Sequence, residues 1–224
     1  MRTGSAGPYI ARPAAGIGRA VLVLHAWWGL NPFLRGFCDR LAGAGFTALA
    51  PDLYHGAIAT TIAEAKKLRG KLKGETVGQE VHEAAGQLQK LSGNQGMGLV
   101  GFSLGGYWGL WLAQQAASPV RAAVIFYGAR QGDYTVSPAA FQFHLAEHDD
   151  YVADSGVKKL RKSLAAAGKE AEFHTYAGTG HWFFEADRPD AYQSPAAELA
   201  WRRTVEFLTQ HIGQKSPTAT GEAR

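Results

Sequence analysis

Short apolar runs alternate with longer amphipathic stretches along almost the whole chain. Residues 20–25 and 97–102 are almost entirely apolar, which is typical of strands that are covered on both faces of a sheet. The stretches between such runs carry apolar residues at helical spacing. The predicted strands cover residues 9–13, 20–25, 46–50, 97–102, 121–127, 141–146 and 170–176. The predicted helices cover residues 32–44, 61–73, 76–92, 104–117, 154–167 and 195–211.

This alternation of strand and helix predicts an α/β fold with a mainly parallel sheet and helices on both of its faces. Asn31 and Pro32 have the residue types preferred at a helix start, and Gly45 ends the helix that follows. Residues 170–176 alternate polar and apolar side chains, which favours a position at the sheet edge. No repeat or linker divides the pattern, so we expect one domain over residues 1–212 and a disordered polar tail over 213–224.

Composition excludes several classes of protein. Cys38 is the only cysteine among 224 residues, which excludes an internal disulfide and a thiolate zinc cluster. No apolar run approaches the ~20 residues of a membrane helix, and no secretory signal is visible, so we expect a cytoplasmic protein that is not bound to membranes. The net charge is +4, with five basic residues in the run 66–73. No aromatic residues are interleaved there, so this run predicts a solvated helix face or a site for anionic substrates rather than a nucleic-acid groove.

The segment Gly101-Phe102-Ser103-Leu104-Gly105 has the pattern Gly-x-Ser-x-Gly. It lies where a predicted strand meets a predicted helix, which is the context of a serine nucleophile on a sharp turn. Glycines on both sides of the serine remove the side chains that would collide in such a turn. We therefore expect Ser103 to be a nucleophile, although a serine at this position can also serve only as a helix cap.

A serine hydroxyl needs a base, and the base needs an orienting acid. In this architecture the acid and the histidine follow the serine in chain order, each on a loop after a strand. His181 follows the last predicted strand in a glycine-rich loop, and Asp149 follows the strand at 141–146. Asp150 is the alternative acid, and Asp133 is a further alternative used in variants of the architecture.

An oxyanion hole requires two backbone donors. We expect one to be the N–H of Leu104, directly after the nucleophile. The other is expected in the loop after the strand at 20–25, at Trp27. Two adjacent indoles at a strand end do not both point inward, so Trp27 or Trp28 is expected to wall a substrate pocket.

Taken together, these motifs make the chain resemble the dienelactone hydrolase family of the α/β-hydrolase superfamily over about residues 8–212. The resemblance implies the α/β-hydrolase fold, a substrate that is a small ester or lactone, and the same nucleophile, acid and base at Ser103, Asp149 and His181. The segments that carry it are 25–31 (HAWWGLN), 50–54 (APDLY), 101–106 (GFSLGG), 148–152 (HDDYV) and 180–183 (GHWF).

The chain departs from the well-known members of that family at three positions. Ser103 stands in place of a cysteine nucleophile, and Ala26 stands in place of a glutamate that manages the thiol. Glu185 stands where those members have a substrate-binding arginine, four residues after the histidine. With Trp182 and Phe183 also expected in the pocket, this substitution predicts that neutral or aromatic esters are preferred over anionic lactones, although the basic run favours the opposite.

The sequence therefore predicts a serine hydrolase that cleaves a carboxylic ester or lactone through an acyl-enzyme. This mechanism needs no metal and no organic cofactor. Two alternatives use the same residues. The triad can transfer the acyl group to another alcohol or amine, or it can be a remnant in a catalytically silent ligand-binding protein.

Overall fold

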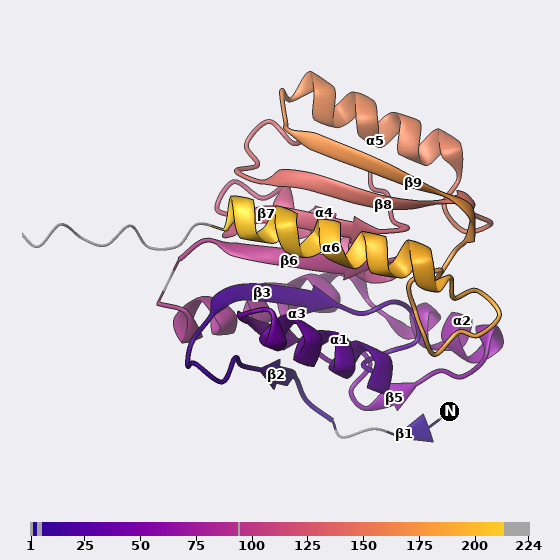
Figure 1. Ribbon diagram of the computed structural model, residues 1–224, viewed down its shortest axis with the longest axis horizontal. Coiled ribbons are helices and arrows are strands. Elements are labelled where there is room, and N and C mark those ends of the chain that lie inside the picture. Colours follow the sequence, from indigo (N-terminus) through magenta and orange to yellow (C-terminus); the bar gives the residue numbers. More distant parts are fainter. Residues whose placement is uncertain (1, 4–5, 94, 213–224) are drawn as a thin grey trace, which may run out of the picture.

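The structure is a computed structural model that describes residues 2–3, 6–93 and 95–212 (Figure 1). Its strands are β1 (Arg2–Thr3), β2 (Tyr9–Ala11), β3 (Arg19–Leu24), β4 (Phe46–Ala50), β5 (Ala57–Ile58), β6 (Met97–Phe102), β7 (Val120–Phe126), β8 (Ala140–His148) and β9 (Ala171–Gly180). Its helices are α1 (Pro32–Gly43), α2 (Ile62–Lys71), α3 (Gly74–Leu91), α4 (Leu104–Ala113), α5 (Asp154–Ala166) and α6 (Ser194–His211).

Seven strands form one sheet in the order β2-β4-β3-β6-β7-β8-β9. All neighbouring strands in it run parallel except β2, which pairs antiparallel with β4. The predicted mainly parallel sheet is thus confirmed, and β9 lies at its edge as its alternating pattern predicts. β1 and β5 form a separate antiparallel ribbon, Arg2 opposite Ile58 and Thr3 opposite Ala57.

Helices cover both faces of the large sheet, and each face has its own hydrophobic core. Alternate strand residues point to opposite faces, so Val21 and Val23 pack in one core with residues of α1 and α6. Leu22 and Leu24 pack in the other core with residues of α3, α4 and α5. No helix in the described ranges is long and apolar enough to cross a membrane.

The helix ends mostly agree with the sequence signals. The Asn31 side chain accepts a hydrogen bond from the backbone N–H of Leu34 and caps α1, with Pro32 as its first residue. α4 is shorter than predicted and ends at Ala113, because the residues after it form tighter turns in which Gln115 and Ser118 bond to carbonyls three residues earlier. The predicted disorder of 213–224 lies outside the described residues.

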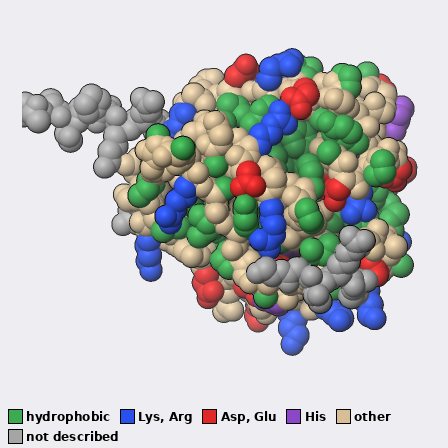
Figure 2. Space-filling view, turned by 60° about the horizontal axis from the view of Figure 1, so that its bottom comes forward, with side chains coloured by type: hydrophobic (Ala, Val, Ile, Leu, Met, Phe, Trp, Pro, Cys, Tyr) green, Lys and Arg blue, Asp and Glu red, His purple; other side chains and the backbone are tan. Residues whose placement is uncertain are grey.

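Parallel strands place their carboxyl ends at the same edge of the sheet, so the loops after β3, β6, β8 and β9 converge there (Figure 1). α2 lies on this side as well. On the face that Figure 2 presents, Lys and Arg side chains are scattered among acidic, apolar and other polar groups. That face does not have the continuous basic stripe typical of a nucleic-acid groove.

Candidate active site

Ser103 occupies a strained turn between β6 and α4. Its φ is 49° and its ψ is −107°, a conformation that costs a non-glycine residue free energy and clusters at functional sites. The turn is possible because a side chain at Gly101 would meet the Gly105 carbonyl at 2.6 Å, and one at Gly105 would overlap the carbonyl of Leu24. The glycines of the motif are therefore required by close backbone approach.

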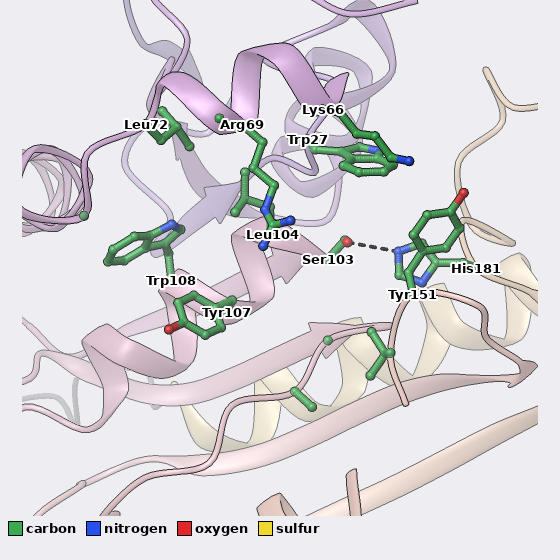
Figure 3. Close-up of a pocket in the computed structure, with 15 residues that line it drawn as sticks. Trp27, Lys66, Arg69, Leu72, Ser103, Leu104, Tyr107, Trp108, Tyr151 and His181 are labelled. Carbon is green, nitrogen blue, oxygen red and sulfur yellow. Dashed lines mark hydrogen bonds between the residues drawn. The ribbon is translucent and has the colours of Figure 1, made fainter. Parts of the chain in front are cut away.

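Ser103, His181 and Asp149 form one chain of hydrogen bonds. The Ser103 Oγ lies 2.9 Å from His181 Nε2, as Figure 3 shows, and both Asp149 carboxylate oxygens lie 2.8 Å from His181 Nδ1. In the tautomer that satisfies both contacts, Nδ1–H donates to Asp149 and Nε2 accepts from the serine hydroxyl. The histidine side chain is 3% exposed and the aspartate side chain 10%, which shields the bonds between them from water.

The geometry also separates the candidate acids: Asp150 is exposed, whereas Asp149 and Asp133 each make defined hydrogen bonds. Asp149 Oδ1 accepts the backbone N–H groups of Tyr151 and Val152 at 2.9 and 2.8 Å, which fixes its carboxylate toward the histidine. Asp133 instead accepts bonds from the backbone and hydroxyl of Thr135, in its own loop. The structure therefore brings Asp149 to His181, and Asp133 belongs to a local turn.

Aromatic rings hold His181 in place from three directions. Its ring centroid lies 4.7 Å from Tyr127, 5.0 Å from Tyr151 and 5.0 Å from Trp182. Such packing restricts rotation of the imidazole, so the nitrogen that faces Ser103 stays in place. Tyr127 and Tyr151 were not among the predicted site residues, because nothing in their local sequence shows that they contact the histidine.

Of the two predicted oxyanion donors, Leu104 adjoins the nucleophile in the chain, and Trp27 lines the same cavity as Ser103. Leu104 is the first residue of α4, and the first N–H groups of a helix have no partner within it. Trp27 lies in the loop after β3, and its side chain lines the same cavity as Ser103.

His25 fixes the peptide that carries the Trp27 N–H. Its Nδ1–H donates to the Ala26 carbonyl at 2.6 Å, and its Nε2 accepts the N–H of Leu53 at 3.2 Å. Complete burial lowers the pKa of His25, which keeps the ring neutral with one donor and one acceptor nitrogen. Since the Ala26 carbonyl and the Trp27 N–H belong to one peptide unit, this bond sets the direction of the predicted oxyanion donor.

A cavity of about 900 Å³ opens above Ser103. α2 and the turn that follows it form one wall, α4 forms the second, and residues of the loops after β3, β7, β8 and β9 form the rest (Figure 3). The residues that line the cavity include Trp27, Lys66, Arg69, Leu72, Leu104, Tyr107, Trp108, Tyr151 and His181.

Four predicted pocket residues do not line this cavity. Trp28, Trp182, Phe183 and Glu185 are buried behind it, with exposed fractions of 2%, 6%, 0% and 2%. Of the adjacent indoles Trp27 and Trp28, Trp27 reaches the cavity, and the Trp182 ring stacks against it with centroids 5.9 Å apart. The prediction for these four positions is therefore wrong, because residues near a site in sequence can still point into the core.

The charge around the cavity is the reverse of the one predicted. Glu185 is buried and accepts a hydrogen bond from the Tyr127 hydroxyl at 2.8 Å. Burial raises the pKa of its carboxyl to about 8, so at neutral pH it is largely uncharged. Lys66 and Arg69 of the basic run line the cavity instead. Glu185 therefore does not disfavour anionic substrates, contrary to the prediction.

The buried Glu185 makes a prediction about stability. The folded protein holds this proton up to about pH 8, whereas the unfolded chain releases it near its ordinary pKa of 4.5. Between these values the folded state binds more protons, so the free energy of unfolding should fall as pH rises, by at most about 1.4 kcal/mol per pH unit. Urea denaturation of wild type and Glu185→Gln between pH 5 and 8 should show a flatter dependence for the variant.

The control for this experiment is Glu206→Gln, which changes an exposed carboxylate on α6. It should retain the wild-type dependence on pH. Equal slopes for wild type and Glu185→Gln would contradict the assignment of a raised pKa to Glu185.

A mainly parallel sheet with a serine turn after a central strand, and with aspartate and histidine on later loops, defines the α/β-hydrolase fold. The solved structure of a "Putative Dienelactone Hydrolase" from Klebsiella pneumoniae superimposes with a TM-score of 0.79 at 26% identity and covers 91% of this chain and 92% of its own.

The chain belongs to the dienelactone hydrolase family, whose sequence profile matches residues 7–212. It is 31% identical to the "Putative carboxymethylenebutenolidase" of Aquifex aeolicus over 216 residues, 91% of this chain and 93% of that protein. It is 30% identical to the "Probable 2-oxo-3-(5-oxofuran-2-ylidene)propanoate lactonase" of a Bradyrhizobium species, covering 91% and 89%. Membership of this family makes the chain a hydrolase that acts on lactone or ester bonds.

Proposed function

We propose that this protein is a serine hydrolase that cleaves a carboxylic ester or lactone through an acyl-enzyme. The observation that carries the proposal is the hydrogen-bonded chain Ser103–His181–Asp149 at the floor of a cavity. This arrangement is the one that converts a weakly nucleophilic hydroxyl into an attacking group.

The reaction begins when Ser103 Oγ attacks the substrate carbonyl and His181 Nε2 takes the hydroxyl proton. Asp149 accepts the hydrogen bond from Nδ1 and stabilises the imidazolium that forms. The N–H groups of Trp27 and Leu104 stabilise the negative oxygen of the tetrahedral intermediate. His181 then passes its proton to the departing alkoxide, and water, activated by the same histidine, hydrolyses the acyl-serine and releases the acid.

Ala26 supports a serine rather than a thiol mechanism. In the well-known members of the family that the chain resembles, a glutamate at this position controls the thiol of a cysteine nucleophile. Here Ala26 is buried and offers only its backbone, whose carbonyl is held by His25. In a Ser–His pair the histidine is the base that activates the serine, so no carboxylate besides Asp149 is needed.

The acyl-enzyme step can be tested by rapid mixing with a 4-nitrophenyl ester. A burst of 4-nitrophenol equal to the enzyme concentration, followed by slower steady release, is the kinetic sign of an acyl-enzyme. Product analysis with added alcohol should show free acid as the main product. Quantitative transfer of the acyl group to the alcohol would contradict hydrolysis and favour the acyltransferase alternative.

The positively charged side chains that line the cavity indicate the charge of the preferred substrate. Lys66 and Arg69 face the space above Ser103, so an ester that carries a carboxylate should be attracted there. Wild type should therefore hydrolyse anionic esters with higher kcat/KM than matched neutral ones. The double variant Lys66→Gln/Arg69→Gln should lower kcat/KM roughly tenfold for the anionic ester and change it little for the neutral ester. The expected loss is modest because both side chains are exposed and solvent screens their charges.

The matched control is Lys158→Gln/Lys159→Gln, which removes two exposed lysines from α5. It should leave the ratio of anionic to neutral kcat/KM at the wild-type value. A wild-type preference for neutral esters that the Lys66 and Arg69 substitutions do not alter would show that these cations do not select the substrate.

A further inference from the structure

The cavity extends to two sides of the nucleophile. His181, Tyr151 and Trp27 lie on one side of Ser103, and Leu104, Tyr107 and Trp108 lie on the other with Leu72 (Figure 3). The second side is formed by α4 and by the turn between α2 and α3. We call the space bounded by Leu72, Leu104, Tyr107 and Trp108 the acyl arm.

The position of the base decides which part of an ester enters each side. The leaving oxygen must lie next to His181 Nε2, because that nitrogen delivers its proton. The carbonyl oxygen must lie between the N–H groups of Trp27 and Leu104. With these two atoms placed, the acyl chain extends away from the histidine and toward the arm on the other side of Ser103.

We propose that the acyl arm is a subsite for a broad, flat and apolar acyl group, such as an aryl-acetyl group. The inference rests on the proposed function and adds the class of acyl group to it. Two aromatic rings and two leucine side chains bound the arm, and the Arg69 side chain reaches toward Leu104 on the same side of Ser103 (Figure 3). Apolar and aromatic surfaces favour a flat apolar ligand, and a guanidinium can lie over the face of an aromatic one.

Each of the two aromatic rings of the arm packs against neighbouring groups that limit its rotation. The guanidinium of Arg130 lies 4.2 Å from the Tyr107 ring centroid, although the tyrosine itself is 42% exposed. Trp108 packs edge-on against Tyr107 and Trp111, each with centroids 5.7 Å apart. A wall that is already ordered loses little side-chain entropy when a ligand binds, so its contacts contribute to affinity.

Gly74 lies beside the Trp108 ring in the lining of the cavity. A Cβ placed at this glycine would lie 3.8 Å from the edge of the Trp108 ring, at ordinary van der Waals distance. Gly74 also lines the cavity, so any longer side chain here would project into or beside the arm. The substitution Gly74→Leu is therefore a way to fill the arm without touching the catalytic groups.

The test compares 4-nitrophenyl phenylacetate with 4-nitrophenyl acetate, which share one leaving group. Wild type should hydrolyse the phenylacetate with a kcat/KM about tenfold higher or more, as expected for an apolar pocket that gains several carbon atoms of contact. Tyr107→Ala, Trp108→Ala and Gly74→Leu should each lower this ratio at least about threefold, while kcat/KM for the acetate changes less. Trp108→Phe should retain most of the ratio and shows whether a flat ring suffices.

A matched control is Tyr192→Ala, an aromatic substitution outside this cavity that should leave the ratio unchanged. Thermal unfolding of each variant confirms that it folds. Equal kcat/KM for the two esters in wild type would overturn the inference, as would folded arm variants that keep the wild-type ratio of the two kcat/KM values. Absence of hydrolysis of either ester by folded wild type would overturn the proposed function itself, and this inference with it.

Discussion

Ser103→Ala should abolish ester hydrolysis while leaving the fold intact. The side chain donates one hydrogen bond to His181 and lies at the cavity floor, so its loss removes the nucleophile and few packing contacts. In a serine protease, removal of the nucleophile lowers kcat by about 10⁶-fold, and a loss approaching this size is expected here. Steady-state hydrolysis of a 4-nitrophenyl ester, together with thermal unfolding, measures both effects.

The control for this substitution is Ser155→Ala, which removes the same hydroxyl from an exposed position in α5. It should behave as wild type in both measurements. A folded Ser103→Ala variant that retains more than about a tenth of the wild-type kcat would remove Ser103 from its proposed role, because such a loss corresponds to little more than 1 kcal/mol of barrier.

Asp149→Asn and His181→Ala should be the next most damaging substitutions. The asparagine keeps the shape of the side chain but can present its NH₂ group to Nδ1, which favours the wrong tautomer of the imidazole; in a serine protease this change lowers kcat by about 10⁴-fold. Each substitution should add little when combined with Ser103→Ala, because the three residues act as one unit. Turnover of the single and double variants on one ester tests both statements.

Asp150→Asn is the matched control, because this neighbouring aspartate is exposed, whereas Asp149 supplies both carboxylate contacts to His181. It should retain activity close to wild type. A mild effect of Asp149→Asn beside a severe effect of Asp150→Asn would mean that the acid is assigned one residue too early.

The strands and the residues of the hydrogen-bonded chain could be predicted because their signals are local. The apolar runs that became β4 and β6 have the lengths of their strands, and the glycines around Ser103 are required by backbone contacts within and beside the turn. Asp149 and His181 directly follow strands whose carboxyl ends share one sheet edge. Chain order alone therefore indicates that these residues meet.

The lining of the cavity could not be predicted because it depends on where side chains point. Trp182, directly after the histidine, has a φ of 68°, and the residues from Trp182 to Glu185 are buried in the core instead of facing the cavity. The number of residues that separate a position from His181 does not show that the chain turns into the core at Trp182. The sequence likewise shows a basic run at 66–73, but only the tertiary packing of α2 brings Lys66 and Arg69 above Ser103.

Pairing between distant short segments was missed for a related reason. The ribbon between Arg2–Thr3 and Ala57–Ile58 consists of two-residue strands, which are too short to show any periodicity. The orientation of the Trp27 peptide by His25 also depends on contacts between separate loops. The His25 ring is held by the backbone N–H of Leu53, which lies in another part of the chain. Such contacts follow from the assembled sheet rather than from any local motif.

The central claim is that Ser103 is an activated nucleophile, and mass spectrometry after treatment with a fluorophosphonate tests it most directly. We expect one covalent adduct per chain, located at Ser103 by peptide mapping. It should be absent in Ser103→Ala and form far more slowly in His181→Ala, since the histidine removes the serine proton. A folded wild-type protein that forms no adduct, or forms it on another residue, would contradict the claim.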